Sequence, residues 1–155
     1  MTTESVRAHF ESLGLNLDIV EHEQSTATVA LAAEAFGVAP GQIAKTLAFR
    51  LASGQAVLVV ASGNVRVDNA KFKQVLGKGK MLSHEEVTAL TGHPVGGVCP
   101  FGLATALPIY LDDSLKAWSE LLPAAGGTRN GVRMTPDLLA HITQGQWVDV
   151  CAQAS

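Results

Sequence analysis

Two apolar runs in the first half of the chain constrain its fold more than any other feature. Residues 43–51 (IAKTLAFRL) and 55–62 (QAVLVVAS) favour extended structure, and only Ala-Ser-Gly separates them. Apolar runs of this length, joined by a short segment that contains glycine, are typical of a β-hairpin inside a sheet. The sequence therefore predicts a sheet with this hairpin at its centre.

Helix signals occur on both sides of the hairpin. They predict five helices, whose caps are Thr3, one of Ser25, Thr26 and Thr28, then Asp68, Ser83 and Thr135. Short strands are expected in LDIVEH, PIYL and WVDV and around the glycine pair of PAAGGTRNGVRM, and SLKAWSELL is expected to form a helix or turn. Because strands and helices are interspersed without a strict βαβ rhythm, we expect an α+β fold. This fold is a mixed β-sheet flanked by helices, in a single domain over residues 1–155.

The composition fits a chain with one hydrophobic core. Hydrophobic residues make up 47% of the 155 positions, and charged or turn residues interrupt every apolar run before the roughly 20 residues that a membrane span needs. The N-terminus lacks the basic and apolar blocks of a signal peptide. Cys99 and Cys151 have no metal-ligand spacing, and two free thiols fit a reducing compartment. We therefore expect a cytoplasmic protein with no metal, no cofactor and no membrane contact.

Charged residues are unevenly distributed along the chain. The formal net charge is −3, which argues against binding DNA through a broad basic surface. Residues 66–80 nevertheless have a local charge of +4, so the remaining residues together carry a formal charge of −7. The basic residues of this stretch are Arg66, Lys71, Lys73, Lys78 and Lys80. They form either a solvated helix face or a surface that contacts RNA phosphates without reading their sequence.

The loop GHPVGGVCPFGL, residues 92–103, is a candidate catalytic loop. Gly96 and Gly97 allow positive φ and a close approach of the backbone to a ligand, while Pro94 and Pro100 restrict the loop before binding. Amide donors of this loop can converge on one oxygen and stabilise an oxyanion. The candidate catalytic residues here are Gly96, Gly97, Val98, Cys99, Pro100 and Phe101. The simpler interpretation is a tight connection rich in turn-forming residues.

Two other interpretations of this loop stay open. In the first, Cys99 is a nucleophile with His93 as its base, although Pro100 removes one amide donor and disfavours a helix that would stabilise the thiolate. In the second, the protein binds its ligand without turnover, because no conventional acid/base pair is evident.

Three segments resemble a known family. IAKTLAF, NVRVDNAKF and VGGVCPFGL are similar to segments of the YbaK/ProX family, free-standing relatives of the editing domain inserted in bacterial prolyl-tRNA synthetases. The resemblance extends over nearly the whole chain. The family's site consists of a strand lysine and a glycine-x-x-x-proline loop, which correspond to Lys45 and to residues 96–100. The resemblance implies a deacylase that acts in trans and hydrolyses the ester between a wrong amino acid and the terminal adenosine of a tRNA. The alternative without turnover is then a module that binds aminoacyl-tRNA or a nucleotide.

The resemblance also implies roles and partners. It favours Lys45 as a clamp for a phosphate of the tRNA acceptor end over a general base, which would need its pKa lowered from about 10.4 by roughly three units. The loop has no obvious acidic or imidazole base except His93, and residues 124–134 lack the histidine of the synthetase-inserted relatives. The resemblance therefore implies that the substrate's own 2′-hydroxyl or ribose takes the proton of the water, while His93 and His22 stay open as candidates. Specificity is expected from pocket size. The expected substrate is tRNA(Pro) carrying alanine or cysteine, or a tRNA mischarged with serine or threonine, and a transient partner is prolyl-tRNA synthetase or another synthetase. The predicted substrate-binding residues are Thr28, His22, Ser62, His93 and Gly102.

Overall fold

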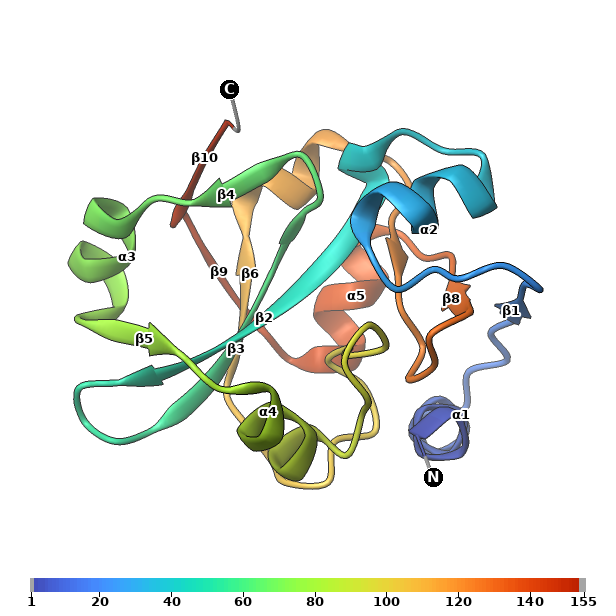
Figure 1. Ribbon diagram of the computed structural model, residues 1–155, viewed down its shortest axis with the longest axis horizontal. Helices are drawn as coiled ribbons and strands as arrows, with labels where there is room; N and C mark the ends of the chain where they lie inside the picture. The colour runs from blue at the N-terminus through green and yellow to red at the C-terminus, as the bar shows by residue number, and fades with distance from the viewer. Residues whose placement is uncertain (1, 154–155) are drawn as a thin grey trace.

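The computed structural model describes residues 2–153, and a mixed sheet runs through its centre (Figure 1). The order of the main strands is β5-β2-β3-β6-β9. They are β2 (Ile43–Leu51), β3 (Ala56–Ser62), β5 (Gly79–Met81), β6 (Ile109–Asp112) and β9 (Gln146–Val148). Strands β2 and β3 pair antiparallel, from Ala44 opposite Ser62 to Arg50 opposite Ala56, and all of β3 is buried. The predicted central hairpin is confirmed.

Parallel and antiparallel pairs are combined in this sheet. β6 runs parallel to both β3 and β9, whereas β5 runs antiparallel to β2. The short strand β7 (Leu122–Pro123) pairs parallel with the start of β2. Two small antiparallel pairs are separate: β1 (Ile19–Glu21) with β8 (Asn130–Val132), and β4 (Val65–Val67) with β10 (Cys151–Gln153). The predicted α+β mixed-sheet fold is confirmed, but the predicted last strand WVDV ends at Val148 and β10 follows it.

Five α-helices occur in the described residues, as predicted. They are α1 (Thr2–Ser12), α2 (Val29–Phe36), α3 (Asn69–Leu76), α4 (His84–Thr91) and α5 (Pro136–Thr143). Each predicted cap of the last four, Thr28, Asp68, Ser83 and Thr135, accepts a hydrogen bond from the backbone N–H three residues later. The prediction for Thr3 is wrong, because α1 already begins at Thr2 and the Thr3 hydroxyl instead accepts a hydrogen bond from Asn130 Nδ2 at 3.0 Å. No helix within residues 2–153 is long and apolar enough to cross a membrane.

Short 3-10 helices complete the connections, and the two sheet faces pack against different α-helices. η1 (Pro40–Gln42) precedes β2, and η2 (Asp113–Ala117) begins the segment expected to be a helix or turn. One face of the sheet forms a core with α5, and the other packs on Phe72 of α3. Helix α3 lies at the end of the molecule opposite α1 and the β1–β8 pair (Figure 1).

The outer edge of β2 is open in the middle of the strand. β7 pairs with Ile43 and Ala44, and β5 pairs with residues 49–51. Leu82, directly after β5, donates its N–H to the Ala48 carbonyl at 3.1 Å. No strand in the described part of the chain pairs with residues 45–47 on this side. These three residues form an interruption of the sheet edge that we call the β2 gap.

Candidate functional site

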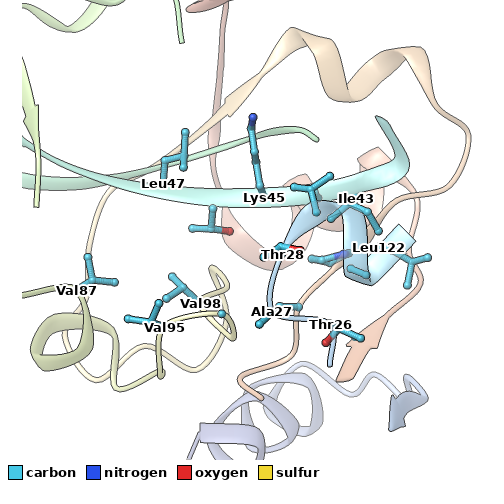
Figure 2. A pocket seen from close by; sticks show the side chains of 18 of the residues that line it. Thr26, Ala27, Thr28, Ile43, Lys45, Leu47, Val87, Val95, Val98 and Leu122 are labelled. Atoms are coloured by element: carbon cyan, nitrogen blue, oxygen red, sulfur yellow. The ribbon is translucent and has the colours of Figure 1, made fainter. Parts of the chain in front are cut away.

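A cavity of about 410 Å³ lies at the β2 gap (Figure 2). Its walls come from five segments that are distant in sequence: the residues before α2, strand β2, the start of α4, the glycine loop, and the segment from β7 to β8. The lining residues include Ala27, Thr28, Lys45, Thr46, Gly96 and Val98. Most of the wall is apolar or small, which is typical of a site for a small ligand held by few polar groups.

The two glycines of the loop 92–103 make close backbone contacts. Gly96 has a φ of +89°, and a Cβ at this position would lie 2.7 Å from the Cβ of Ala27 across the cavity wall. A Cβ at Gly97 would lie 2.9 Å from the backbone of Gly127. Positive φ therefore occurs at Gly96 but not at Gly97, where the close approach alone requires glycine.

The amide groups of this loop are only partly available to a ligand. Gly97 donates its N–H to the Pro94 carbonyl at 2.9 Å, and Gly102 donates to His9 Nδ1 at 3.0 Å. Val98 lines the cavity, and its N–H makes no hydrogen bond within residues 2–153. The expected convergence of donors from Gly97 to Phe101 is therefore reduced, and the loop residues on the cavity wall are Val95, Gly96 and Val98.

Cys99 and His93 lie in the core beneath the loop. Cys99 and His93 are both 0% exposed, and neither lines the cavity. His93 Nε2 is 2.6 Å from the Phe101 carbonyl and 3.5 Å from Cys99 Sγ. Burial raises the pKa of the Cys99 thiol to about 12 and lowers the pKa of His93. Burial at this position therefore disfavours a thiolate at Cys99.

Lys45 lines the cavity but directs its ammonium group elsewhere. Figure 2 shows the Lys45 and Leu47 side chains on one side of β2 and Val95 and Val98 on the other. Lys45 Nζ donates a hydrogen bond to the carbonyl of Val65 on β4. Burial lowers the pKa of Lys45, and the nearby Cys151 thiol opposes this shift. Lys45 is the only lysine or arginine among the described residues that line the cavity.

The other predicted substrate-binding residues fall in different places. Thr28 lines the cavity and also caps α2 through a hydrogen bond from Leu31 N–H. The ring of His22 packs edge-on against Phe36, with 4.4 Å between the ring centroids, and His22 does not line the cavity. Ser62 is buried beneath Trp118, whose Nε1 donates to the Ser62 hydroxyl at 3.2 Å. The structure thus brings Thr28 together with Lys45, Gly96 and Val98, and leaves the rest outside the cavity.

The basic stretch 66–80 extends from β4 through α3 to β5. Its exposed side chains are Arg66, Lys73, Lys78 and Lys80. Lys71 differs, because its ammonium pairs with Asp149 at 3.2 Å and donates to the Cys151 carbonyl at 3.0 Å. The hydrogen bond with Asp149 raises the pKa of Lys71. The stretch ends next to Met81, which lines the cavity, so that Lys78 and Lys80 lie nearest its mouth.

Sequence analysis missed several polar residues of the cavity wall. Thr46 is partly buried, and its hydroxyl oxygen is buried without a hydrogen-bond partner among the described residues. Asn130 is buried and accepts a hydrogen bond from Gly127 N–H. The Thr26 hydroxyl donates to the Asn130 carbonyl at 3.3 Å. A threonine next to Lys45 in an apolar run was the available signal for Thr46, whereas nothing local indicated that Asn130 would reach the same cavity.

Comparisons with known proteins identify the family of this chain. Residues 23–142 match the family "Aminoacyl-tRNA editing domain". The chain is 44% identical over 153 residues to "Uncharacterized protein YwhH" of Bacillus subtilis (strain 168), covering 97% of this chain and 98% of that protein. It is 29% identical over 120 residues to "Putative Cys-tRNA(Pro)/Cys-tRNA(Cys) deacylase EbsC" of Enterococcus faecalis, covering 76% and 73%.

Larger synthetases and solved structures give the same result. A "Proline--tRNA ligase" of Bacillus licheniformis is 31% identical over 109 residues, which are 69% of this chain but 19% of that protein. A structure described as "Crystal structure of a putative trans-editing enzyme for prolyl tRNA synthetase" superposes with a TM-score of 0.89 at 36% identity, covering 99% of this chain and 98% of that one. The predicted resemblance is confirmed, and so, at the level of the family, is the prediction of an aminoacyl-tRNA deacylase. The chain belongs to the family of aminoacyl-tRNA editing domains.

Proposed function

We propose that this protein deacylates mischarged tRNA in trans and that the cavity at the β2 gap receives the aminoacyl group. The observation that carries the proposal is the position of this cavity. It lies between the glycine loop and the strand of Lys45, the two features that the resemblance gives as the family's site, and the basic stretch 66–80 ends one residue before Met81 on its wall. A pocket near 400 Å³ is at the lower end of the range for small ligands, so it suits an amino acid joined to part of an adenosine.

Hydrolysis of an aminoacyl ester requires few catalytic groups from the protein. An aminoacyl ester is already activated, so the catalyst must mainly position a water and stabilise the oxyanion that forms. The amide of Val98 is our first candidate donor, because Val98 lines the cavity and its N–H has no partner within residues 2–153. The 2′-hydroxyl of the terminal ribose accepts the proton of the water. Lys45 exchanges the Val65 carbonyl for a phosphate of the acceptor end.

The close approach of the glycine loop to Ala27 favours a small amino acid. A Cβ at Gly96 would lie 2.7 Å from the Cβ of Ala27, so a bulky substituent has no room between the loop and Ala27. Exclusion of a larger correct amino acid is the principle of double-sieve editing. Alanine and cysteine are therefore the first amino acids to test, and the name of the Enterococcus relative adds weight to cysteine. Serine and threonine come next.

A deacylation panel tests the proposal. The full chain is incubated with tRNA(Pro) charged with alanine, cysteine, serine, threonine or, as the correct control, proline, and release of the labelled amino acid is compared with spontaneous hydrolysis. The panel also includes seryl and threonyl esters of non-cognate tRNAs. We expect turnover of at least one small amino acid while prolyl-tRNA(Pro) is spared. Binding without hydrolysis of any member would instead establish a binding module, and neither binding nor hydrolysis would refute the proposal.

A further inference from the structure

A threonine of the cavity wall has a buried hydroxyl that the rest of the described chain leaves without a partner. Thr46 lies in the middle of the β2 gap, and its hydroxyl oxygen makes no hydrogen bond among residues 2–153. A buried hydroxyl that makes no hydrogen bond is unfavourable, and such groups in native proteins require an explanation. A ligand that supplies the missing partner is one explanation.

The main chain of Thr46 faces the same gap. In an antiparallel ladder, the N–H and C=O of successive residues point alternately to one neighbouring strand and to the other. Leu51 N–H donates to the Gln55 carbonyl inside the hairpin, so the odd-numbered residues of β2 face β3. The Ala48 carbonyl accepts from Leu82 on the outer side, so the even-numbered residues face outward. The N–H and C=O of Thr46 therefore point into the gap, where no strand of the described chain pairs with them.

We propose that the aminoacyl group of the substrate pairs with Thr46 as an added β-strand of one residue. The α-ammonium donates to the Thr46 carbonyl and to its hydroxyl oxygen, and the ester carbonyl accepts the Thr46 N–H. These are the two main-chain hydrogen bonds that opposed residues exchange in an antiparallel pair, and pairing of an extended ligand with a free sheet edge is a common mode of recognition. The inference rests on the proposed function and names the group that this site recognises.

The cavity wall offers neutral acceptors to the α-ammonium, and Lys45, the one lysine among the described lining residues, directs its own ammonium away to the Val65 carbonyl. No aspartate or glutamate lies among the described residues that line the cavity, so carbonyl and hydroxyl oxygens are the acceptors available there. The pairing also fixes the direction of the substrate side chain, because directly opposed residues of an antiparallel pair place their side chains on the same face of the sheet. An L-amino acid then extends on the side of Ala44 and Ala48, away from the Lys45 and Leu47 side chains and toward Val95 and Val98 (Figure 2).

Substrate analogues test the role of the α-amino group. The wild-type chain is assayed with the aminoacyl-tRNA that it hydrolyses best, and with the same tRNA carrying the corresponding α-hydroxy acid or the N-acetylated amino acid. Loss of hydrogen bonds from a charged group is expected to lower kcat/KM by about tenfold or more for both analogues. Equal turnover of the aminoacyl and α-hydroxyacyl esters would overturn the inference while leaving the deacylase function in place.

Variants at Thr46 separate recognition from stability. Thr46→Val removes the hydroxyl at nearly constant shape, so we expect kcat/KM to fall by about tenfold for the aminoacyl ester and to change little for the α-hydroxyacyl ester. Thr46→Ser retains the hydroxyl and is expected to retain discrimination between the two esters. Because the hydroxyl has no partner among the described residues of the free protein, the Tm of Thr46→Val should equal or exceed that of the wild type.

A control and a defined failure complete the test. Thr105→Val makes the same change at an exposed threonine outside the cavity and should alter neither ester's kcat/KM. If Thr46→Val discriminates between the two esters as strongly as the wild type, the inference is wrong. If the wild type hydrolyses no aminoacyl-tRNA at all, the proposed function has failed instead, and the two failures are therefore distinguishable.

Discussion

Within the loop that follows α4, residues 95–98 (the cavity half) and residues 99–101 (the core half) differ in what they contact. Val95, Gly96 and Val98 line the cavity, and Val95 is 50% exposed at its rim. Cys99 and Phe101 are 0% exposed, and the Phe101 ring packs edge-on against Phe10 with 5.0 Å between the ring centroids. The second half therefore anchors the loop in the core, while the first half presents its backbone to a ligand.

This difference predicts two kinds of mutational effect. A change in the cavity half should reduce activity more than stability, because that half packs little into the core. A change in the core half should reduce stability more than activity, because the buried side chains of that half do not reach the cavity. The buried side chains of the core half, including the Cys99 thiol, therefore do not reach the cavity.

The largest effect is expected from Gly96→Val. A β-branched residue strongly disfavours a φ of +89°, and its Cβ would meet Ala27 at 2.7 Å, so the loop must shift and carry the Val98 amide with it. Loss of one oxyanion donor costs on the order of 100-fold in rate, and we expect a loss of that size in kcat/KM for deacylation.

A matched glycine provides the control for this variant. Gly54 in the β2–β3 turn has a φ of +93°, and no atom lies within 4 Å of a Cβ placed there. Gly54→Val therefore introduces the same backbone strain away from the cavity, and it should lower Tm without a comparable loss of deacylation. If both variants lose activity in proportion to their loss of Tm, the lower activity of Gly96→Val comes from lower stability and not from a displaced loop backbone.

The next largest effect is expected at Lys45. Hydrogen bonds to charged groups contribute about 1.5–3 kcal/mol, so Lys45→Ala should lower kcat/KM by about tenfold or more if the ammonium clamps a phosphate. Burial holds the pKa of Lys45 below its ordinary value of 10.5. A clamp works in the protonated form, so activity should fall as pH rises through this lowered pKa. A general base would show the opposite dependence.

Lys45→Met separates the clamp from a structural role. The variant keeps most of the apolar stem but loses the ammonium, together with its hydrogen bond to Val65. A clamp predicts that Met and Ala lose similar activity, whereas a packing role predicts that Met restores it. Circular dichroism and Tm report whether the fold is retained. Wild-type kcat/KM in both variants would exclude Lys45 from substrate binding.

Local signals in the sequence were sufficient to predict most helices and strands, but not the position of the cavity. The caps at Thr28, Asp68, Ser83 and Thr135 depend on residues within one turn of the helix, and each is found at a predicted position. The start of α1 was misplaced because helix ends vary by one or two residues. The position of β6 between β3 and β9 depends on pairing between distant segments, which no local pattern contains.

The site residues divide in the same way. Lys45 and Gly96 were identified from motifs, and both line the cavity. Cys99 is buried where His93 Nε2 lies near both its sulfur and the Phe101 carbonyl. Nothing in the local sequence of Cys99, His93 or Phe101 indicates this packing. The position of Thr46 beside Lys45 was a local signal, but its role depends on the interruption between β5 and β7, which is a property of the sheet edge rather than of the threonine.

A smaller effect is expected from the basic stretch. Replacing Lys73, Lys78 and Lys80 together by glutamine should weaken tRNA binding and flatten its dependence on salt. The slope of log K against log salt should change by about 0.7–0.9 for each phosphate that these lysines neutralise in the wild type. Lys71→Gln is the control, because the Lys71 ammonium is already paired with Asp149. Filter binding of tRNA between low and moderate salt measures the slope, and an unchanged slope in the triple variant would place the RNA on another surface.

The smallest effect on activity is expected at Cys99, and it tests the core half of the loop directly. Its thiol is fully buried with a pKa raised to about 12, and His93 Nε2 lies closer to the Phe101 carbonyl at 2.6 Å than to the sulfur at 3.5 Å. When Nε2 donates its proton to that carbonyl, it cannot act as a base toward the thiol. Cys99→Ala should therefore keep deacylation within about twofold of the wild type, while the space left in the core lowers stability by about 1 kcal/mol.

The same buried thiol should resist alkylation in the folded protein and react only after unfolding, so iodoacetamide should leave activity intact under native conditions. Activity should also show no rise toward the thiol's pKa, since a thiolate nucleophile would gain reactive form as pH approaches about 12. Loss of turnover in Cys99→Ala with an unchanged Tm, or an acyl adduct on Cys99 in the mass spectrum, would show that the core half, and not the cavity half, takes part in catalysis. The side chain rather than the backbone would then perform the chemistry, and the loop would have to open for the substrate to reach it.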